Sequence, residues 1–178
     1  RGDIAGISRA HGAMLMVDEA HETGVFSAGL VEHGNLEEYV NISMGTLSKA
    51  LAGYGGFVAC TPQMRSLLVN RARAFIYTTA LPPACVGSAL GALEVMEKEP
   101  DQGRELLDRA AKFRNQLNDA GLDTLASESQ IIPVLAGSSK KALGFAERLR
   151  REGIQTVAIR PPTVPRGTAR LRFSVTLA

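Results

Sequence analysis

The spacing of hydrophobic and polar residues along the chain predicts an alternation of strands and helices. Short apolar runs predict strands at residues 13–17, 40–44, 56–60, 74–79, 130–135, 156–159 and 169–175. Apolar residues at helical spacing predict helices at residues 4–10, 63–73, 84–98, 101–120 and 139–152. The glycine-rich stretch 22–34 is expected to be a loop. Strands that alternate with helices in this way indicate an α/β fold.

The chain is expected to divide near Pro100, which interrupts the helical pattern. Residues 101–178 continue with the strand and helix pattern of a small α+β domain. We therefore expect residues 1–100 and residues 101–178 to belong to different domains. The first residues have the pattern of the middle of a helix and the last that of an interrupted strand, so we expect a piece of a longer protein.

Composition excludes several classes of function. The net charge of +2 and the lack of a basic block do not favour nucleic-acid binding. No apolar run approaches the roughly 18 residues that a membrane span requires. Cys60 and Cys85 lack the spacing of metal ligands, so we expect no metal site. We expect both cysteines to be free thiols in a reducing compartment. A cytoplasmic location is therefore expected.

Lys49 lies at the centre of the most distinctive segment, between the strands expected at 40–44 and 56–60. Thr46 and Ser48 beside it carry hydroxyls that can bond phosphate oxygens. Glycines, which permit close backbone approach to a ligand, stand at positions 45, 53, 55 and 56. An amine in a partly desolvated pocket is a nucleophile that can form an imine. The structural alternative is a solvated lysine in a strand-to-loop connection.

Asp18 and His21 follow the strand expected at 13–17, where open α/β sheets place ligand groups. A carboxylate paired with a ring nitrogen keeps that nitrogen protonated and makes the ring an electron sink. The structural alternative is a carboxylate that caps the next turn and a histidine bonded to backbone. A rival function is a DEAH-type helicase, in which the acidic pair holds magnesium. The helicase interpretation predicts an arginine motif downstream and a basic face for nucleic acid, and the sequence shows neither. It also leaves Lys49 without a role.

Arginines and threonines provide further candidate anion contacts. Arg160 precedes a proline-stiffened loop, and Arg170 and Arg172 alternate on one strand, so their side chains point the same way. Such arginines can clamp a carboxylate, or they can simply cover an exposed strand face. Thr78 and Thr79 at a predicted strand end can contact phosphate, although turn chemistry is the ordinary role of such residues.

Four ordered motifs together resemble the pyridoxal-phosphate (PLP) enzymes of the aspartate-aminotransferase fold (fold type I), and within them the α-oxoamine synthases. The matching segments are VDEAHETGVF, GTLSKALAGYGGFV, IYTTALPPA and AIRPPTVPRGTARLRFSVTLA. The last segment is most similar to the 8-amino-7-oxononanoate synthases, which implies biotin biosynthesis. The resemblance assigns residues 1–100 to the C-terminal part of the cofactor-binding large domain, which has a mostly parallel sheet. It assigns residues 101–178 to an incomplete small α+β domain.

By position, the resemblance implies a cofactor role for each matching residue. Lys49 would form the imine with the cofactor, Asp18 would pair with its ring nitrogen, and His21 with its phenolic oxygen. Thr46 would bind the cofactor phosphate. Thr79, with Thr78, would reach the phosphate in the neighbouring subunit, because these enzymes build shared sites in a homodimer.

The resemblance also implies the substrates. Arg172 matches the arginine that holds the amino-acid carboxylate, and Arg160 is assigned to the acyl substrate. The implied reaction is a decarboxylative condensation of a small amino acid with an acyl-CoA or acyl-carrier thioester, which gives an α-amino ketone. The N-terminal half of such an enzyme is expected to be missing, so this piece alone is expected to be inactive. The alternatives are another α-oxoamine synthase, a fold-type-I aminotransferase or lyase, and a non-catalytic domain.

Overall fold

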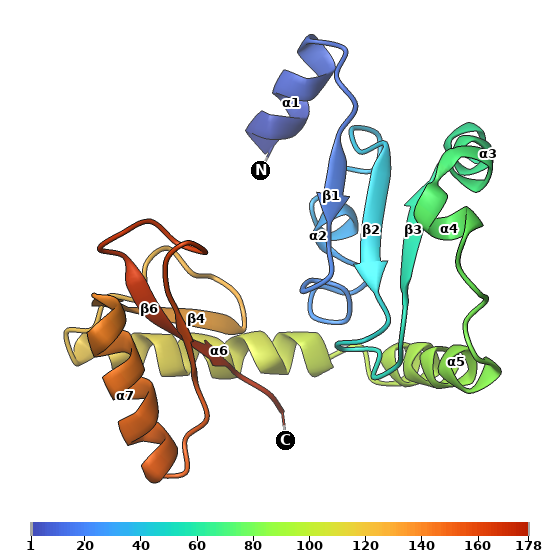
Figure 1. Cartoon of the computed structure of the whole chain (residues 1–178). Helices are drawn as coiled ribbons and strands as arrows, with labels where there is room; N and C mark the ends of the chain where they lie inside the picture. The colour runs from blue at the N-terminus through green and yellow to red at the C-terminus, as the bar shows by residue number, and fades with distance from the viewer. Residues whose placement is uncertain (1, 178) are drawn as a thin grey trace. The chain divides into compact units, whose positions relative to one another are not determined.

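A computed structural model describes residues 2–177 and divides them into two compact units (Figure 1). The first unit extends to Gly103 and the second begins at Arg104. Each unit has its own sheet, and each is described by itself below.

The first unit contains a three-stranded sheet in the order β1-β2-β3. Its elements are α1 (Gly2–Ala10), β1 (Met16–Asp18), α2 (Leu30–His33), β2 (Ile42–Thr46), β3 (Gly56–Cys60), α3 (Pro62–Arg71), α4 (Arg73–Ile76) and α5 (Pro83–Lys98). β1 and β2 are parallel, with Asp18 in register with Met44, and β3 is antiparallel to β2. The arrowheads in Figure 1 show that β1 and β2 end at the same edge of the sheet. Asp18 and Thr46, two of the residues that the sequence singled out, are the last residues of these two strands.

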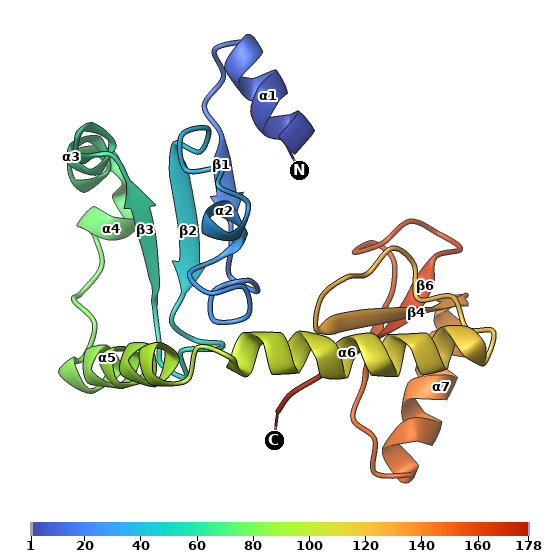
Figure 2. The ribbon, with the colours of Figure 1, turned by 180° about the vertical axis from the view of Figure 1, so that it is seen from behind.

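The second unit packs two helices on one face of an antiparallel sheet. Its elements are α6 (Gln102–Asp119), which begins at the division, β4 (Ile131–Gly137), α7 (Ser139–Arg151), β5 (Val157–Ile159) and β6 (Ala169–Ser174). The strand order is β4-β6-β5. Phe113 of α6 meets Phe173 of β6 edge to face at 5.5 Å, and α6 runs beside the sheet in Figure 2. The buried core of this unit includes Ala110, Ile132, Val134, Ala142, Ala169 and Leu171.

Most of the expected elements are present, with ends shifted by a few residues. Thr61 is the N-cap of α3, where its hydroxyl accepts a hydrogen bond from the Met64 backbone N–H at 3.3 Å. At the start of α7 the Ser138 hydroxyl likewise accepts a hydrogen bond from the Lys141 backbone N–H at 3.3 Å.

The strand expected at residues 74–79 was a wrong prediction. The chain instead forms the short helix α4, whose last turn is closed by the Tyr77 backbone N–H donating to the Arg73 carbonyl at 3.1 Å. Aromatic and β-branched residues favour a strand only where a neighbouring strand is available to pair with it. Among the described residues this segment pairs with no strand, and Phe75 and Tyr77 are exposed. The short helix α2, inside the loop expected at 22–34, was not predicted.

Candidate active site

The sheet edge formed by β1 and β2 brings together the two motifs that the sequence predicted to act jointly. Asp18 is the last residue of β1 and is in register with Met44 of β2. β2 ends two residues later at Thr46, and Lys49 follows in the connection to β3. Because side chains alternate along a strand, Asp18, Met44 and Thr46 belong to the same face of the sheet. The structure therefore places a carboxylate and the lysine segment at one edge.

Residues 47–55, which we call the lysine loop, form a compact turn held by its own backbone. The Leu47 N–H donates to the Gly55 carbonyl at 2.9 Å, and the Gly53 N–H donates back to the Leu47 carbonyl at 2.6 Å. The Ala52 N–H donates to the Lys49 carbonyl at 3.0 Å. Leu51 is the buried anchor of the loop, with 1% of its surface exposed, whereas Lys49 is exposed. The loop thus combines a fixed backbone with an accessible amine.

Two hydroxyls lie at the start of this loop. Thr46 Oγ1 is 2.8 Å from Ser48 Oγ and donates to the Gly55 carbonyl at 3.0 Å. It also accepts the Ser48 backbone N–H at 3.2 Å. Since hydroxyl hydrogens can rotate, both groups can turn to donate to an anion that approaches this edge.

The glycines of this segment serve the packing of the chain itself. A Cβ at Gly45 would run into the ring of Phe57, its antiparallel partner. A Cβ at Gly55, whose φ is +109°, would come within 2.8 Å of the Leu81 side chain. These two positions are therefore filled by protein atoms, and the expectation that they leave room for a ligand is wrong.

The contact with Leu81 also brings the Thr78 and Thr79 segment to the lysine loop. Both threonines are exposed and lie in the connection between α4 and α5. Ser88 of α5 donates to the Ala52 carbonyl at 3.3 Å. In both views the carboxyl end of β2 points toward α5 (Figures 1 and 2).

Asp18 and His21 lie at the start of the segment that leaves β1. Asp18 Oδ1 accepts a hydrogen bond from the Ala20 backbone N–H at 2.9 Å. This is the turn-capping role that the sequence analysis gave as the alternative to cofactor binding. The contact engages one of the two carboxylate oxygens of Asp18. The His21 backbone N–H donates to Glu22 Oε2 at 3.1 Å, and the imidazole is exposed.

Glu19, which the sequence did not single out, is buried between these two residues. Only 4% of its surface is exposed. Its carboxyl group accepts the Val31 backbone N–H at 2.8 Å and the hydroxyl of Ser43. Nothing in the local sequence distinguishes it from an exposed strand-end carboxylate, because both partners are distant along the chain.

The predicted substrate arginines belong to the second unit and differ in their surroundings. Arg170 is tied to Thr168 by hydrogen bonds of 3.0 Å to its carbonyl and 3.1 Å to its hydroxyl. Arg172 Nε is buried and has no hydrogen-bond partner among the described residues. Arg160 is exposed, directly after β5. Of the two arginines on β6, Arg172 is the one with a buried donor that has no partner among the described residues.

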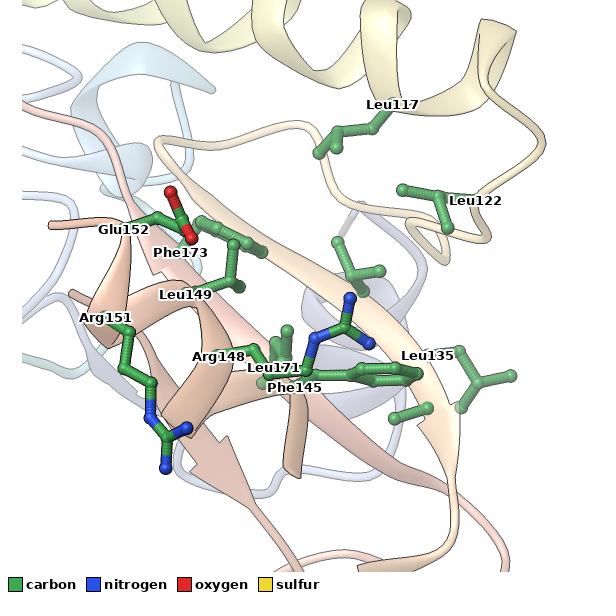
Figure 3. Close-up of a pocket in the computed structure, with 12 residues that line it drawn as sticks. Leu117, Leu122, Leu135, Phe145, Arg148, Leu149, Arg151, Glu152, Leu171 and Phe173 are labelled. Atoms are coloured by element: carbon green, nitrogen blue, oxygen red, sulfur yellow. The ribbon is translucent and has the colours of Figure 1, made fainter. Parts of the chain in front are cut away.

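An apolar cavity of about 610 Å³ also lies in the second unit (Figure 3). Its lining comes from α6, β4, α7, β6 and the turns beside them: Leu117, Leu122, Val134, Leu135, Ala136, Phe145, Arg148, Leu149, Arg151, Glu152, Leu171 and Phe173. None of the residues that the sequence assigned to a site is among them.

Two findings bear on the excluded classes. Within residues 2–177, no three or more His, Cys, Asp or Glu residues are grouped so that they could hold a metal ion. The helices described in the structure include none that is long and apolar enough to cross a membrane.

Comparison with known proteins identifies what the chain is similar to. The family model of aminotransferase class I and II matches residues 2–178. The 8-amino-7-oxononanoate synthase of Geobacter sulfurreducens is 44% identical over 177 residues, which are 97% of this chain and 45% of that protein. The chain thus spans less than half the length of this curated relative.

Solved structures give the same result for the fold. A serine palmitoyltransferase with a PLP internal aldimine matches with a TM-score of 0.90 at 29% identity, covering 98% of this chain and 45% of that one. The 8-amino-7-oxononanoate synthase of Francisella tularensis matches with a TM-score of 0.80 at 28% identity, covering 97% and 52%. These matches confirm the expected α/β fold class, and they do not support the helicase alternative for residues 18–21.

Proposed function

The chain belongs to the aminotransferase class I and II family, and from this premise we propose that the protein carrying it is an α-oxoamine synthase. The proposed reaction is the PLP-dependent decarboxylative condensation of a small amino acid with an acyl-CoA or acyl-carrier thioester to an α-amino ketone. The 44% identity to an 8-amino-7-oxononanoate synthase supports that branch.

The observation that carries the proposal is the shared edge of β1 and β2. Asp18 and the lysine loop come from separate segments, and the parallel register of Asp18 with Met44 brings their strand ends together. Ligands of open α/β sheets bind outside the carboxyl ends of the strands. A carboxylate, an amine and two hydroxyls at this edge fit a ligand that has a protonated ring nitrogen, an aldehyde and a phosphate.

PLP, when bound, would supply an electron sink for the charge that develops on the amino acid. Asp18 would hold a proton on the ring nitrogen, and His21 would donate to the phenolic oxygen. Thr46 would donate to the phosphate. Lys49 would bind the cofactor through Nζ and, once released, remove the proton from the α-carbon of the amino acid. Lys49 is exposed on a loop whose backbone is hydrogen-bonded to itself, so its amine is accessible to the cofactor.

Arg172 would hold the carboxylate of the amino acid, and Arg160 would contact the acyl substrate. The unused Nε donor of Arg172 supports its role, since carboxylates are bound by arginine in a two-pronged geometry. Arg172→Ala should therefore raise the KM for the amino acid by about 10-fold to 100-fold, the loss of one to two charge-assisted hydrogen bonds. Arg170→Ala is the matched control, because Arg170 is already bonded to Thr168. Equal KM values for the two variants would refute the assignment.

The assembly is proposed to be a homodimer in which Thr79, with Thr78, reaches the cofactor phosphate of the neighbouring subunit. Both threonines are exposed on a segment that Leu81 holds against the lysine loop. A cytoplasmic location goes with this proposal.

Borohydride reduction of the full-length protein, followed by peptide mass mapping, tests the proposal directly. The expected result is a pyridoxyl group on Lys49 and on none of the other lysines of this chain, Lys98, Lys112, Lys140 and Lys141. A folded, PLP-supplied protein with an unmodified Lys49 would overturn the proposed function.

The reaction class is tested by supplying acyl-CoA thioesters with alanine, glycine or serine. Release of free thiol together with carbon dioxide supports a condensing synthase, and the preferred amino acid separates its branches. Transfer of the amino group to a keto acid without thiol release would instead identify an aminotransferase.

A further inference from the structure

We infer that Glu19 is a positioning residue that sets the direction of Asp18 and His21 at the sheet edge, an inference that rests on the proposed function. Glu19 is the residue between the end of β1 and the segment that carries His21, and 4% of its surface is exposed. A buried carboxyl group is costly unless its oxygens are hydrogen-bonded, so its partners indicate what it is for.

Every polar group of Glu19 has a partner. Its backbone N–H donates to the Met44 carbonyl at 2.7 Å, which continues the pairing of β1 with β2 by one residue. Its carbonyl accepts the backbone N–H of Glu22 and of Thr23, each at 3.0 Å, and the Thr23 hydroxyl at 3.0 Å. Its backbone therefore fixes both the strand end before it and the turn that carries His21 after it.

The side chain of Glu19 joins three segments. One oxygen accepts the Val31 N–H at 2.8 Å at the start of α2, and the other accepts the hydroxyl of Ser43 on β2. Gly29 completes the pocket, because a Cβ there would lie 2.6 Å from the Glu19 Cδ atom. The carboxyl group thus ties the far end of the 20–31 segment back to the strand that leads to Lys49.

The geometry separates this anchor from the reactive face. Ser43 is the neighbour of Met44 along β2, so its side chain belongs to the opposite face from Met44 and from Asp18, which is in register with Met44. Glu19 therefore holds the strand end from one face while Asp18 is presented on the other. Loss of the anchor frees the turn that Asp18 caps through Ala20.

Three substitutions give a graded test in the full-length protein. Glu19→Ala removes both side-chain hydrogen bonds and leaves the Val31 N–H and the Ser43 hydroxyl without this partner. Ser43→Ala removes one of them. Glu19→Gln keeps both, because its amide oxygen can accept from Val31 and its NH₂ can donate to Ser43. Glu38→Ala, at an exposed position of the same unit, is the control.

Two readouts distinguish positioning from plain stability. The first is hydrogen exchange of residues 20–31, which should accelerate in Glu19→Ala and remain near wild type in Glu19→Gln. The second is the pH midpoint of the absorption change of the bound cofactor, which responds to the carboxylate beside the ring nitrogen. We expect this midpoint to shift in Glu19→Ala, with kcat lower by about 10-fold to 100-fold and a nearly unchanged KM, as small misplacements of reacting groups cause.

The outcomes decide between the possibilities. A folded Glu19→Ala protein with a lower melting temperature but an unchanged pH midpoint and kcat would show that Glu19 is structural only, and overturn the inference. If Glu19→Ala does not fold, Ser43→Ala decides, and an unchanged midpoint there overturns it equally. A wild-type protein without any cofactor absorption would instead overturn the proposed function, while the exchange experiment still tests the anchor.

Discussion

Leu51→Ala tests whether the buried leucine of the lysine loop holds the loop in place. Leu51 has 1% of its surface exposed and stands two residues after Lys49. The substitution removes three carbon atoms, and at about 0.8 kcal/mol for each buried carbon the lost transfer free energy is about 2.4 kcal/mol. The cavity left behind adds to this, so we expect a cost of about 3 kcal/mol, inside the usual range of about 2–5 kcal/mol for such changes.

Hydrogen exchange of the loop measures this cost locally in the full-length protein. The amides of Leu47, Ala52 and Gly53 are hydrogen-bonded within the loop and report its opening. A cost of about 3 kcal/mol corresponds to exchange that is about 100-fold faster, since each 1.4 kcal/mol is a factor of ten. Borohydride labelling of Lys49 should fall in parallel, because the amine loses its fixed position.

Leu67→Ala is the matched control for this substitution. Leu67 lies in α3 of the same unit with 52% of its surface exposed, so its truncation should leave exchange in the lysine loop unchanged. The reasoning is refuted if Leu51→Ala accelerates loop exchange by no more than Leu67→Ala does.

Two further predictions concern α7. Gly144 is inside the helix and Gly153 follows it with φ +80°, and a Cβ would meet no atom within 4 Å at either position. Urea unfolding should therefore show Gly144→Ala to be stabilising by about 0.5–1 kcal/mol and Gly153→Ala to be destabilising by about 1 kcal/mol; effects of the same sign would contradict this. Hydrogen bonds from Arg150 and then Arg151 lower the pKa of Glu147 below its ordinary value of 4.5. The stability that Glu147 contributes is thus present above pH 4.5 and is lost as the pH falls through the lowered pKa. The free energies of unfolding of Glu147→Gln and wild type, measured by urea titration, should therefore differ slightly at neutral pH and converge in acid.

The long periodic elements of this chain could be predicted from sequence. α6 and α7 each contain enough turns for the apolar period to be clear, and β3 is bounded by glycine and proline signals. The segment 74–79 could not be predicted in the same way, because its aromatic and β-branched residues favour a strand, whereas the chain forms helix α4 and pairs there with no described strand. The family expected from the four motifs is confirmed by the match over residues 2–178.

The candidate site was predictable where position along a strand determines position in space. Asp18 ends β1 and Lys49 follows β2, and the parallel pairing of β1 with β2 is sufficient to bring their carboxyl ends to one edge of the sheet. The anchor at Glu19 was not predictable, since it depends on Val31 and Ser43, which are 12 and 24 residues away. The roles assigned to Lys49, Asp18, His21, Thr46, Thr78, Thr79, Arg160 and Arg172 stay predictions, to be decided by the experiments above.

The alternation along β6 has a consequence for how this chain tolerates changes in length. Leu171 and Phe173 face the helices of the second unit, and Arg170 and Arg172, which alternate with them, belong to the other face. A deletion or insertion of one residue within β6 would exchange the two sets and drive arginines into the apolar core. The 160–168 turn before β6 can accommodate such an insertion or deletion, because a change of length there leaves the pairing of Leu171 with Val134 intact. Natural length variation among related chains should therefore occur in that turn and be excluded from the strand.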